Sequence, residues 1–253
     1  MKVTFLGTGS SLGIPVLGND DPVCLSKNPK DKRLRTSALV EWEDYKFVID
    51  CGPDFRQQLL AQNIDTVNGI FFTHEHTDHV IGFDEVRALG FRQGTVPIYA
   101  DNRVIKALKS RFYYIFDPNR RYALAPTVEI NEVINDSYTF GGVKVTPIHI
   151  MHGKLPILGY RFGDFTYITD AKTIPEADIE KIKGTEVLVV NAVRREPHPS
   201  HFNLDEALRF IQKINPKKAY LTHISHYLGF HDEVEKELPE NIYLAYDNLT
   251  ITI

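Results

Sequence analysis

Hydrophobic residues along the chain occur mostly in short β-branched or aromatic runs separated by turn residues, a pattern typical of paired strands. Turn dipeptides between some runs predict hairpins, at Gly141-Gly142, Gly163-Asp164 and Asp247-Asn248. The runs predict strands at Val3–Leu6, Ser37–Glu41, Lys46–Asp50, Gly69–Thr73, Val96–Ala100, Tyr138–Phe140, Val143–Ile150, Leu158–Phe162, Phe165–Thr169, Val187–Asn191, Ala219–Thr222, Ile242–Ala245 and Leu249–Ile253.

A second apolar spacing, of three to four residues, predicts a smaller number of helices. The clearest begins after Asn203, a favourable N-cap with Glu206 three residues later, and its apolar positions end before Pro216. The other helices are predicted over Phe55–Gln62, Asp84–Gly90, Arg103–Phe112, Ile174–Ile182 and Asp232–Glu237.

The order of these elements predicts an α/β fold. Paired strands with intermittent helices fill residues 1–135 and again residues 136–253, which suggests two similar halves. A four-layer α/β/β/α sandwich, with two sheets face to face and helices outside, satisfies this pattern with one core. No linker rich in Gly, Pro and Ser interrupts the chain, so we expect residues 1–253 to form a single domain.

Composition and charge restrict the function. The net charge of −4 gives no overall positive field, so a long nucleic acid is not an expected partner. The only cysteines, Cys24 and Cys51, fit a reducing compartment, and we expect a cytoplasmic protein that is not exported. No run approaches the ~20 apolar residues of a membrane helix. The composition is compatible with a homodimer.

The segment from Thr73 to His79 carries the most informative chemistry. It follows the apolar run Gly69–Phe72 and places three histidines and an aspartate within six positions: His74, His76, Asp78 and His79. Imidazole nitrogens and carboxylate oxygens are typical ligands of zinc and other first-row divalent metals. We therefore predict a metal site in the turn after this strand.

This H-x-H-x-D-H pattern resembles that of the metallo-β-lactamase superfamily, and the resemblance extends over essentially the whole chain. It implies that His74 and His76 bind one metal with His152, and that Asp78 and His79 bind a second with His223. Asp170, at the end of a predicted strand, matches the bridging aspartate. The expected cofactors are two divalent ions, either Zn or Mn, which ~3.5–4 Å apart would lower the pKa of a shared water.

His149 is an alternative to His152 as the third histidine of the first metal. Positions 149 and 152 face opposite sides of a strand, so only one can point at the metals. We favour His152 because Gly153 and Lys154 follow it as they do in the resembling family, and we expect His149 to be an interior histidine or one that contacts a ligand.

Three further stretches, Leu6–Pro15, Asp31–Ser37 and Pro197–Phe202, are similar to segments of the phosphodiesterases of phosphonate degradation. By this resemblance, the expected substrate is a small anionic phosphodiester, cyclic or linear, and His201 lies over it as a catalytic residue together with Asp78. A titratable imidazole there would protonate the leaving oxygen or stabilise charge on the phosphoryl group.

The chain departs from that branch at a structural zinc site. Family members commonly carry C-x-C-x-x-C and a fourth ligand, whereas this chain has Asn19, Asp21, Cys24 and His226 at those positions. Two thiolates are missing, so at most a weak zinc site of Asp21, Cys24 and His226 is expected, and Cys24 is more simply a small buried apolar residue.

Two other functions remain as alternatives. A transfer-RNA 3′-processing nuclease shares the ligands but carries a long arm, for which the interval of 18 positions from His152 to Asp170 leaves no room. A lactamase or lactonase would use the same metals on a neutral ring. Arg35 and Lys154 are the candidate substrate-binding cations, although basic residues are usually solvated.

Overall fold

In the computed structural model, which describes residues 1–253, the strands form two seven-stranded sheets. The first sheet has the order β14-β1-β2-β3-β4-β5-β6 and the second the order β13-β12-β11-β10-β9-β8-β7. The strands are β1 (Lys2–Gly7), β2 (Ser37–Trp42), β3 (Tyr45–Ile49), β4 (Gly69–Phe71), β5 (Thr95–Ala100), β6 (Thr127–Glu132), β7 (Tyr138–Phe140), β8 (Val143–His152), β9 (Leu155–Phe162), β10 (Phe165–Tyr167), β11 (Val187–Asn191), β12 (Lys218–Thr222), β13 (Ile242–Leu244) and β14 (Thr250–Thr252).

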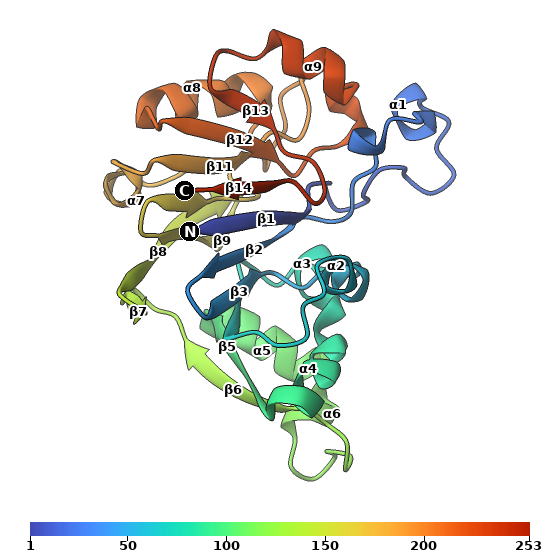
Figure 1. Cartoon of the computed structure of the whole chain (residues 1–253), viewed down its shortest axis with the longest axis vertical. Coiled ribbons are helices and arrows are strands. Elements are labelled where there is room, and N and C mark those ends of the chain that lie inside the picture. The colour runs from blue at the N-terminus through green and yellow to red at the C-terminus, as the bar shows by residue number, and fades with distance from the viewer.

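Helices cover the outer face of each sheet. In Figure 1 the helices between β3 and β6 lie on one side of the strands, and the last two helices lie on the other. The helices are α1 (Pro22–Leu25), α2 (Phe55–Ala61), α3 (Thr77–Val80), α4 (Val86–Gln93), α5 (Asn102–Arg111), α6 (Tyr113–Phe116), α7 (Glu176–Ile182), α8 (Leu204–Ile214) and α9 (His231–Glu237). The predicted four-layer α/β/β/α sandwich is confirmed.

Aromatic side chains fill the space between the sheets. Phe71 of β4 lies 4.9 Å from Tyr160 and 5.4 Å from Phe162, both in β9 of the other sheet, measured between ring centroids. Two further apolar clusters pack the outer face of each sheet against its helices. Because both faces are covered, β11 is buried along its whole length, as expected for an interior parallel strand.

The predicted helix after Asn203 is confirmed in detail. The Asn203 side chain accepts a hydrogen bond from the Glu206 amide, and the Glu206 carboxylate accepts one from the Asn203 amide, which completes a capping box. The other predicted helices are also present, with ends shifted by up to three residues. None of the helices is long and apolar enough to cross a membrane.

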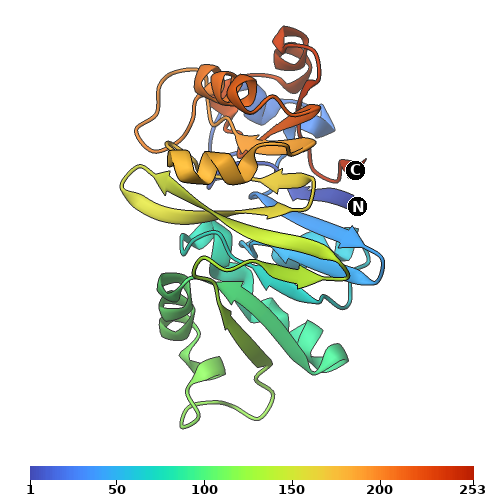
Figure 2. The same ribbon diagram turned by 90° about the vertical axis from the view of Figure 1, so that its left-hand side faces the viewer.

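The hairpin predicted at Asp247-Asn248 is wrong. β13 belongs to the second sheet, whereas β14 pairs with β1 in the first, so this turn carries the chain from one sheet to the other. The Asp247 carboxylate holds the crossing by accepting hydrogen bonds from the Thr8 hydroxyl (2.7 Å) and the Leu34 amide (2.6 Å). The two chain ends consequently lie side by side (Figures 1 and 2).

Other elements also differ from expectation, since the short helices α1 and α6 were not predicted. The edge strand β6 was not predicted, although its apolar residues Val128 and Ile130 alternate with polar ones as in a half-buried strand. The segment with the predicted metal site is partly helical, since Thr77–Val80 forms the single turn of α3 and only the residues before it are a loop. The hairpin turns at Gly141-Gly142 and Gly163-Asp164 are confirmed.

Loss of the Phe71 ring should loosen the contact between the sheets. We expect Phe71→Ala to lower the free energy of unfolding by about 3–5 kcal/mol, because it opens a cavity among aromatic side chains. Phe91, which is 63% exposed, is the matched control, and its alanine variant should change stability by less than about 0.5 kcal/mol. Urea unfolding measures both, and equal effects would contradict the packing described here.

Candidate metal centre

All the candidate ligands lie at or just after the carboxyl ends of strands. β3 and β4 run parallel in the first sheet, and β10, β11 and β12 run parallel in the second, so these ends meet at one edge of the sandwich. The residues after β4 supply His74, His76, Asp78 and His79, β8 ends in His152, and Asp170 and His223 follow β10 and β12.

Three of the residues at these strand ends have a left-handed backbone. Asp50, Asp170 and His223 have φ angles of 62°, 57° and 55°. Residues other than glycine rarely adopt this backbone conformation, and the strain costs about 1–3 kcal/mol at each position. Strained positions of this kind cluster at functional sites, so three of them at these strand ends support a site here.

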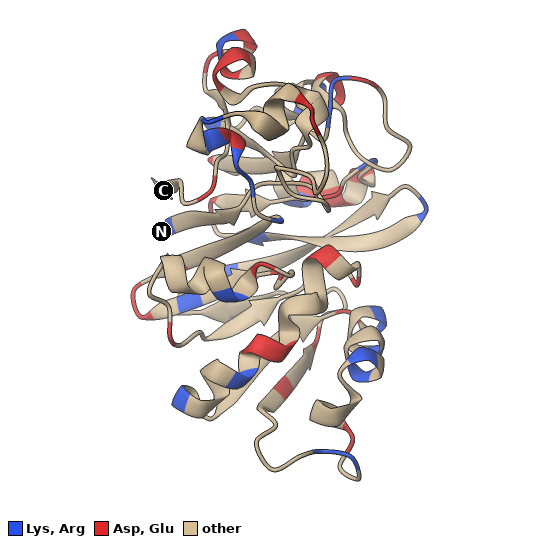
Figure 3. Ribbon diagram, turned by 90° about the vertical axis from the view of Figure 1, so that its right-hand side faces the viewer, with Lys and Arg blue, Asp and Glu red and all other residues tan.

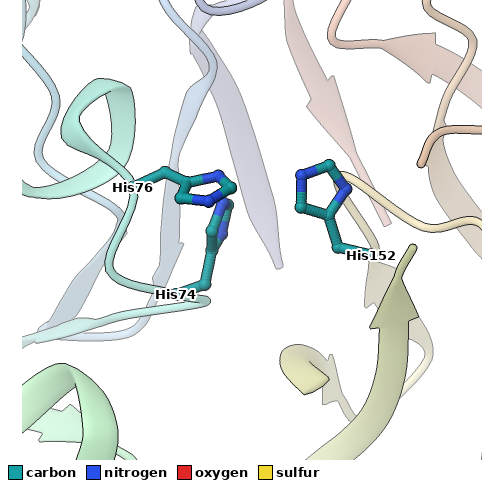
Figure 4. Close-up of side chains that lie close together, drawn as sticks. All are labelled: His74, His76 and His152. Carbon is teal, nitrogen blue, oxygen red and sulfur yellow. The ribbon is translucent and has the colours of Figure 1, made fainter. Parts of the chain in front are cut away.

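Three histidines from both sheets form the first group of candidate ligands. His74 and His76 come from the loop after β4, and His152 comes from β8 (Figure 4). Their ring centroids lie 4.6 Å (His74 to His76), 5.6 Å (His74 to His152) and 5.2 Å (His76 to His152) apart. One nitrogen from each ring lies within 4.8 Å of the others, close enough to share one ion.

Asp78, His79 and His223 form a second group, whose ligand atoms also lie within 4.8 Å of one another. Asp170 lies between the two groups. One of its carboxylate oxygens is 3.4 Å from His79 Nε2, and the other is 3.2 Å from His223 Nε2. Asp170 also lies within ligand distance of His74 and of His152.

Hydrogen bonds behind three of the rings set their orientation. His79 Nδ1 donates to the Asp50 carboxylate (2.7 Å), and His152 Nδ1 donates to the Ser200 carbonyl (2.8 Å). The Thr73 hydroxyl donates to Asp50 (2.7 Å) and therefore accepts from His74 Nδ1 (3.0 Å). With the proton on Nδ1, each ring presents Nε2 as a free ligand atom.

Several buried nitrogens in the centre have no hydrogen-bond partner, and this shows whether metal ions would fit there. Nε2 of His74, Nε2 of His79 and both ring nitrogens of His223 are buried and make no hydrogen bond. Buried polar atoms are normally paired, so buried nitrogens that converge on carboxylates without a hydrogen bond fit divalent cations as their partners. The nitrogen and oxygen donors suit zinc, manganese or a similar divalent ion.

The pKa directions agree with a site that needs positive charge. Burial lowers the pKa of His74 well below its usual value, which keeps this ring neutral and able to bind a metal. Burial also acts to lower the pKa of His79, but the carboxylates of Asp78, Asp170 and Asp50 outweigh it and raise that pKa well above normal. These carboxylates would favour a metal cation in the same way.

His201 belongs to neither of these two groups, but it forms a further group with His152 and Asp170, whose ligand atoms all lie within 4.8 Å of one another. Its Nε2 is 3.0 Å from an Asp170 oxygen, and its Nδ1 is 3.0 Å from His198 Nδ1. Burial lowers the pKa of His201 to about 4. His76 is exposed, and Asp78 and His201 are partly exposed, so the centre is open to solvent on their side.

The residues considered for a weak structural zinc do not assemble into a ligand group. Cys24 packs in a small apolar cluster with Ile14 and Val23. The Asp21 carboxylate caps α1, and His226 Nε2 contacts the Asn19 amide at 3.3 Å. None of the groups of three candidate ligands in the structure includes Asp21, Cys24 or His226.

The two candidate substrate-binding cations differ in their surroundings. The Arg35 guanidinium is engaged by the Asp54 carboxylate at 3.4 Å and by the Ser11 carbonyl at 3.2 Å. Lys154 is exposed on the turn between β8 and β9, two residues from His152. His149, the rejected alternative, hydrogen-bonds Asn135 at 2.7 Å and belongs to no ligand group.

Sequence reasoning missed Asp50, which is fully buried and accepts hydrogen bonds from Thr73 and His79. An aspartate directly after the apolar run Phe47–Ile49 was the available signal, because a carboxylate in such a position needs partners.

Comparison with known proteins agrees with this geometry. A family model described as "Beta-lactamase superfamily domain" matches residues 45–224. The solved structure of "a New Diphosphatase from the PhnP Family" is 38% identical, with a TM-score of 0.93, and the match covers 100% of this chain and 97% of that one. The fold and the site therefore define a metal centre of the metallo-β-lactamase type. The chain belongs to the beta-lactamase superfamily, close to the PhnP family of that diphosphatase.

Two curated relatives match over part of their length. "Octanoyltransferase" of Porphyromonas gingivalis is 38% identical over 256 residues, covering 100% of this chain and 52% of that protein. "Ribonuclease Z" of Prochlorococcus marinus subsp. pastoris is 30% identical over 175 residues, covering 65% of this chain and 50% of that protein. The chain thus spans about half the length of these curated relatives.

Asp50→Asn should weaken metal binding although Asp50 is not a candidate ligand. Loss of the charge that orients the His79 ring is expected to lower metal affinity by about 10–100-fold. Asp84→Asn, an exposed carboxylate on the helical segment after α3, is the control and should bind metal normally. Metal content at graded free-metal concentration measures the effect, and an unchanged affinity for Asp50→Asn would refute this role.

Proposed function

We propose that this chain is a dinuclear metal-dependent phosphodiesterase. In this proposal His74, His76 and His152 hold one divalent ion, Asp78, His79 and His223 hold the other, and Asp170 contacts both. The observation that carries the proposal is the position of Asp170. Its two oxygens lie 3.4 Å from His79 Nε2 and 3.2 Å from His223 Nε2 in the second group, and it is also within 4.8 Å of ligand atoms of His74 and His152 in the first. A carboxylate shared between two groups is the arrangement that a pair of ions requires.

Each part of the centre has a distinct role in this reaction. Two bound divalent ions would lower the pKa of a water between them and stabilise charge on the phosphoryl oxygens. The chain itself orients the ligands through Asp50, Thr73 and Ser200, and His201 faces the solvent-open side. There His201 would stabilise charge on the phosphoryl oxygen or protonate the leaving oxygen.

Charge supports an anionic substrate of small size. With neutral imidazoles, two divalent ions and the carboxylates of Asp78 and Asp170 leave a net charge of about +2 at the centre. Elsewhere Lys and Arg are interspersed with Asp and Glu along the chain (Figure 3), and no overall positive charge favours a polyanion. The short β9–β10 hairpin between His152 and Asp170 also leaves no place for an RNA-gripping arm.

A diphosphate linkage is the second candidate substrate. The likeness at 38% identity is to a protein described as a diphosphatase. Hydrolysis of a diphosphate diester would use the same two ions and the same attacking water, so the geometry of the centre suits both reactions. A neutral lactam or lactone would gain less from the positive charge.

A substrate panel tests the proposed function directly. We expect the metal-loaded protein to hydrolyse cyclic or linear small phosphodiesters, or diphosphate-linked nucleotides, with a kcat/KM well above that for lactones and lactams. A chelator should abolish the activity, and Zn or Mn should restore it. Preferential turnover of neutral rings, or full activity of metal-free protein, would contradict the proposal.

Asp170→Ala should disable both ion sites together. Because this carboxylate faces both groups, we expect its loss to reduce the bound metal from two ions per chain to one or none and to abolish measurable turnover. Cys24→Ala, outside the centre, should keep two ions and near-normal kcat. Elemental analysis gives the stoichiometry, and two tightly bound ions in Asp170→Ala would exclude the shared position.

His201→Ala should separate catalysis from metal binding. We expect kcat on a phosphodiester to fall by about 10²–10⁴-fold, the range for loss of a general acid or base, while two ions stay bound. If His201 protonates the leaving oxygen, the loss will be larger for poor leaving groups than for nitrophenolates. His149→Ala, which removes a histidine hydrogen-bonded away from the centre, is the matched control. An unchanged kcat in His201→Ala would remove this residue from the reaction.

A further inference from the structure

The first group of candidate ligands comes from two separate segments of the chain, one in each sheet. His74 and His76 lie on the loop after β4 in the first sheet, whereas His152 ends β8 in the second. In Figure 4 the first two rings face the third across a gap between these segments. The geometry of this group therefore depends on whatever fixes the loop relative to the β8–β9 strand pair.

Arg103, near the start of α5, contacts both segments. Its Nε donates to the Glu75 carboxylate at 3.0 Å, and its Nη2 donates to the Pro156 carbonyl. Glu75 stands between His74 and His76 in the sequence. Pro156 lies opposite Met151 in the β8–β9 ladder, next to the pair of His152 with Leu155. The Arg103 guanidinium thus binds a residue adjacent to both loop ligands. It also binds a residue one register position from the pair that His152 forms with Leu155.

A second arginine of the same helix strengthens the hold on the loop. Arg111, the last residue of α5, donates from Nη1 to the Glu75 carbonyl at 2.5 Å. Two residues of α5 therefore donate hydrogen bonds to Glu75, one to its side chain and one to its backbone carbonyl. The helix itself packs on the outer face of the first sheet through Val104, Ile105 and Leu108, which makes it a rigid support.

We propose that Arg103 is a positioning residue, which ties the loop carrying His74 and His76 to the strand pair carrying His152 and so sets the affinity of the first ion site. This inference rests on the proposed dinuclear function. The planar guanidinium presents several donors in a fixed fork, and this lets it hold a carboxylate and a carbonyl at once. An ordinary surface ion pair between Arg103 and Glu75 would leave metal binding unchanged.

Stepwise removal of metal from the full chain tests this role. We expect Arg103→Ala to release one of its two ions at a chelator concentration about 10–100-fold lower than the unaltered protein requires. This is the usual effect of losing a residue that orients metal ligands. Arg103→Lys should behave like Arg103→Ala, because a single ammonium does not span both acceptors. Elemental analysis after dialysis against graded chelator counts the ions that remain.

Three comparisons isolate the effect. In a His152→Ala background, where the first site is already broken, adding Arg103→Ala should not alter the retention of the remaining ion. Arg120→Ala removes an exposed guanidinium that is paired with Asp117 and should release both ions as the unaltered protein does. The melting temperature of metal-free Arg103→Ala should match that of the unaltered metal-free protein, which separates positioning from general loss of stability.

The outcomes are distinct. Superimposable release curves for Arg103→Ala and the unaltered protein would overturn the inference, and so would full retention of both ions by Arg103→Lys, since the charge alone would then suffice. Those results leave the dinuclear centre intact. An unaltered protein that never holds two ions would refute the proposed function, and this inference with it.

Discussion

The structure depends on one constraint: several carboxylates lie close together and are largely buried away from water. Asp50, Asp78 and Asp170 gather around His79, and together they raise the pKa of that imidazole well above its usual value. Negative charges held this closely in a protein interior are costly unless cations compensate them. The unpaired nitrogens of His74, His79 and His223 point into the same space, so the centre is built around positive charge that divalent ions would supply.

The fold meets this constraint by placing strand ends from both sheets at one edge. Each group of candidate ligands draws on both halves of the chain: His74 and His76 join His152, and Asp78 and His79 join His223. The aromatic core around Phe71 and Tyr160 keeps the two sheets in register beneath the site. Packing between the sheets is therefore a condition for the chemistry as well as for stability, because neither half carries a complete group.

The sequence was most informative where local pattern and chemistry coincide. The four-layer fold, the capped helix after Asn203 and the ligand candidates in H-x-H-x-D-H follow from periodicity, capping and residue type. The crossing of the last strand into the first sheet was not predictable, because it depends on Asp247 meeting Thr8 and Leu34 from the far end of the chain. Asp50 and Arg103 were missed for the same reason: each acts through a partner more than 20 residues away.

The most direct test of the central claim is an anomalous diffraction map of crystals grown with zinc and recorded at the zinc absorption edge. Two peaks per chain are predicted, one among Nε2 of His74, His76 and His152 and the other among Asp78, His79 and His223, with Asp170 in contact with both. A single peak in this centre, or zinc bound at Asp21, Cys24 and His226 in its place, would contradict the account.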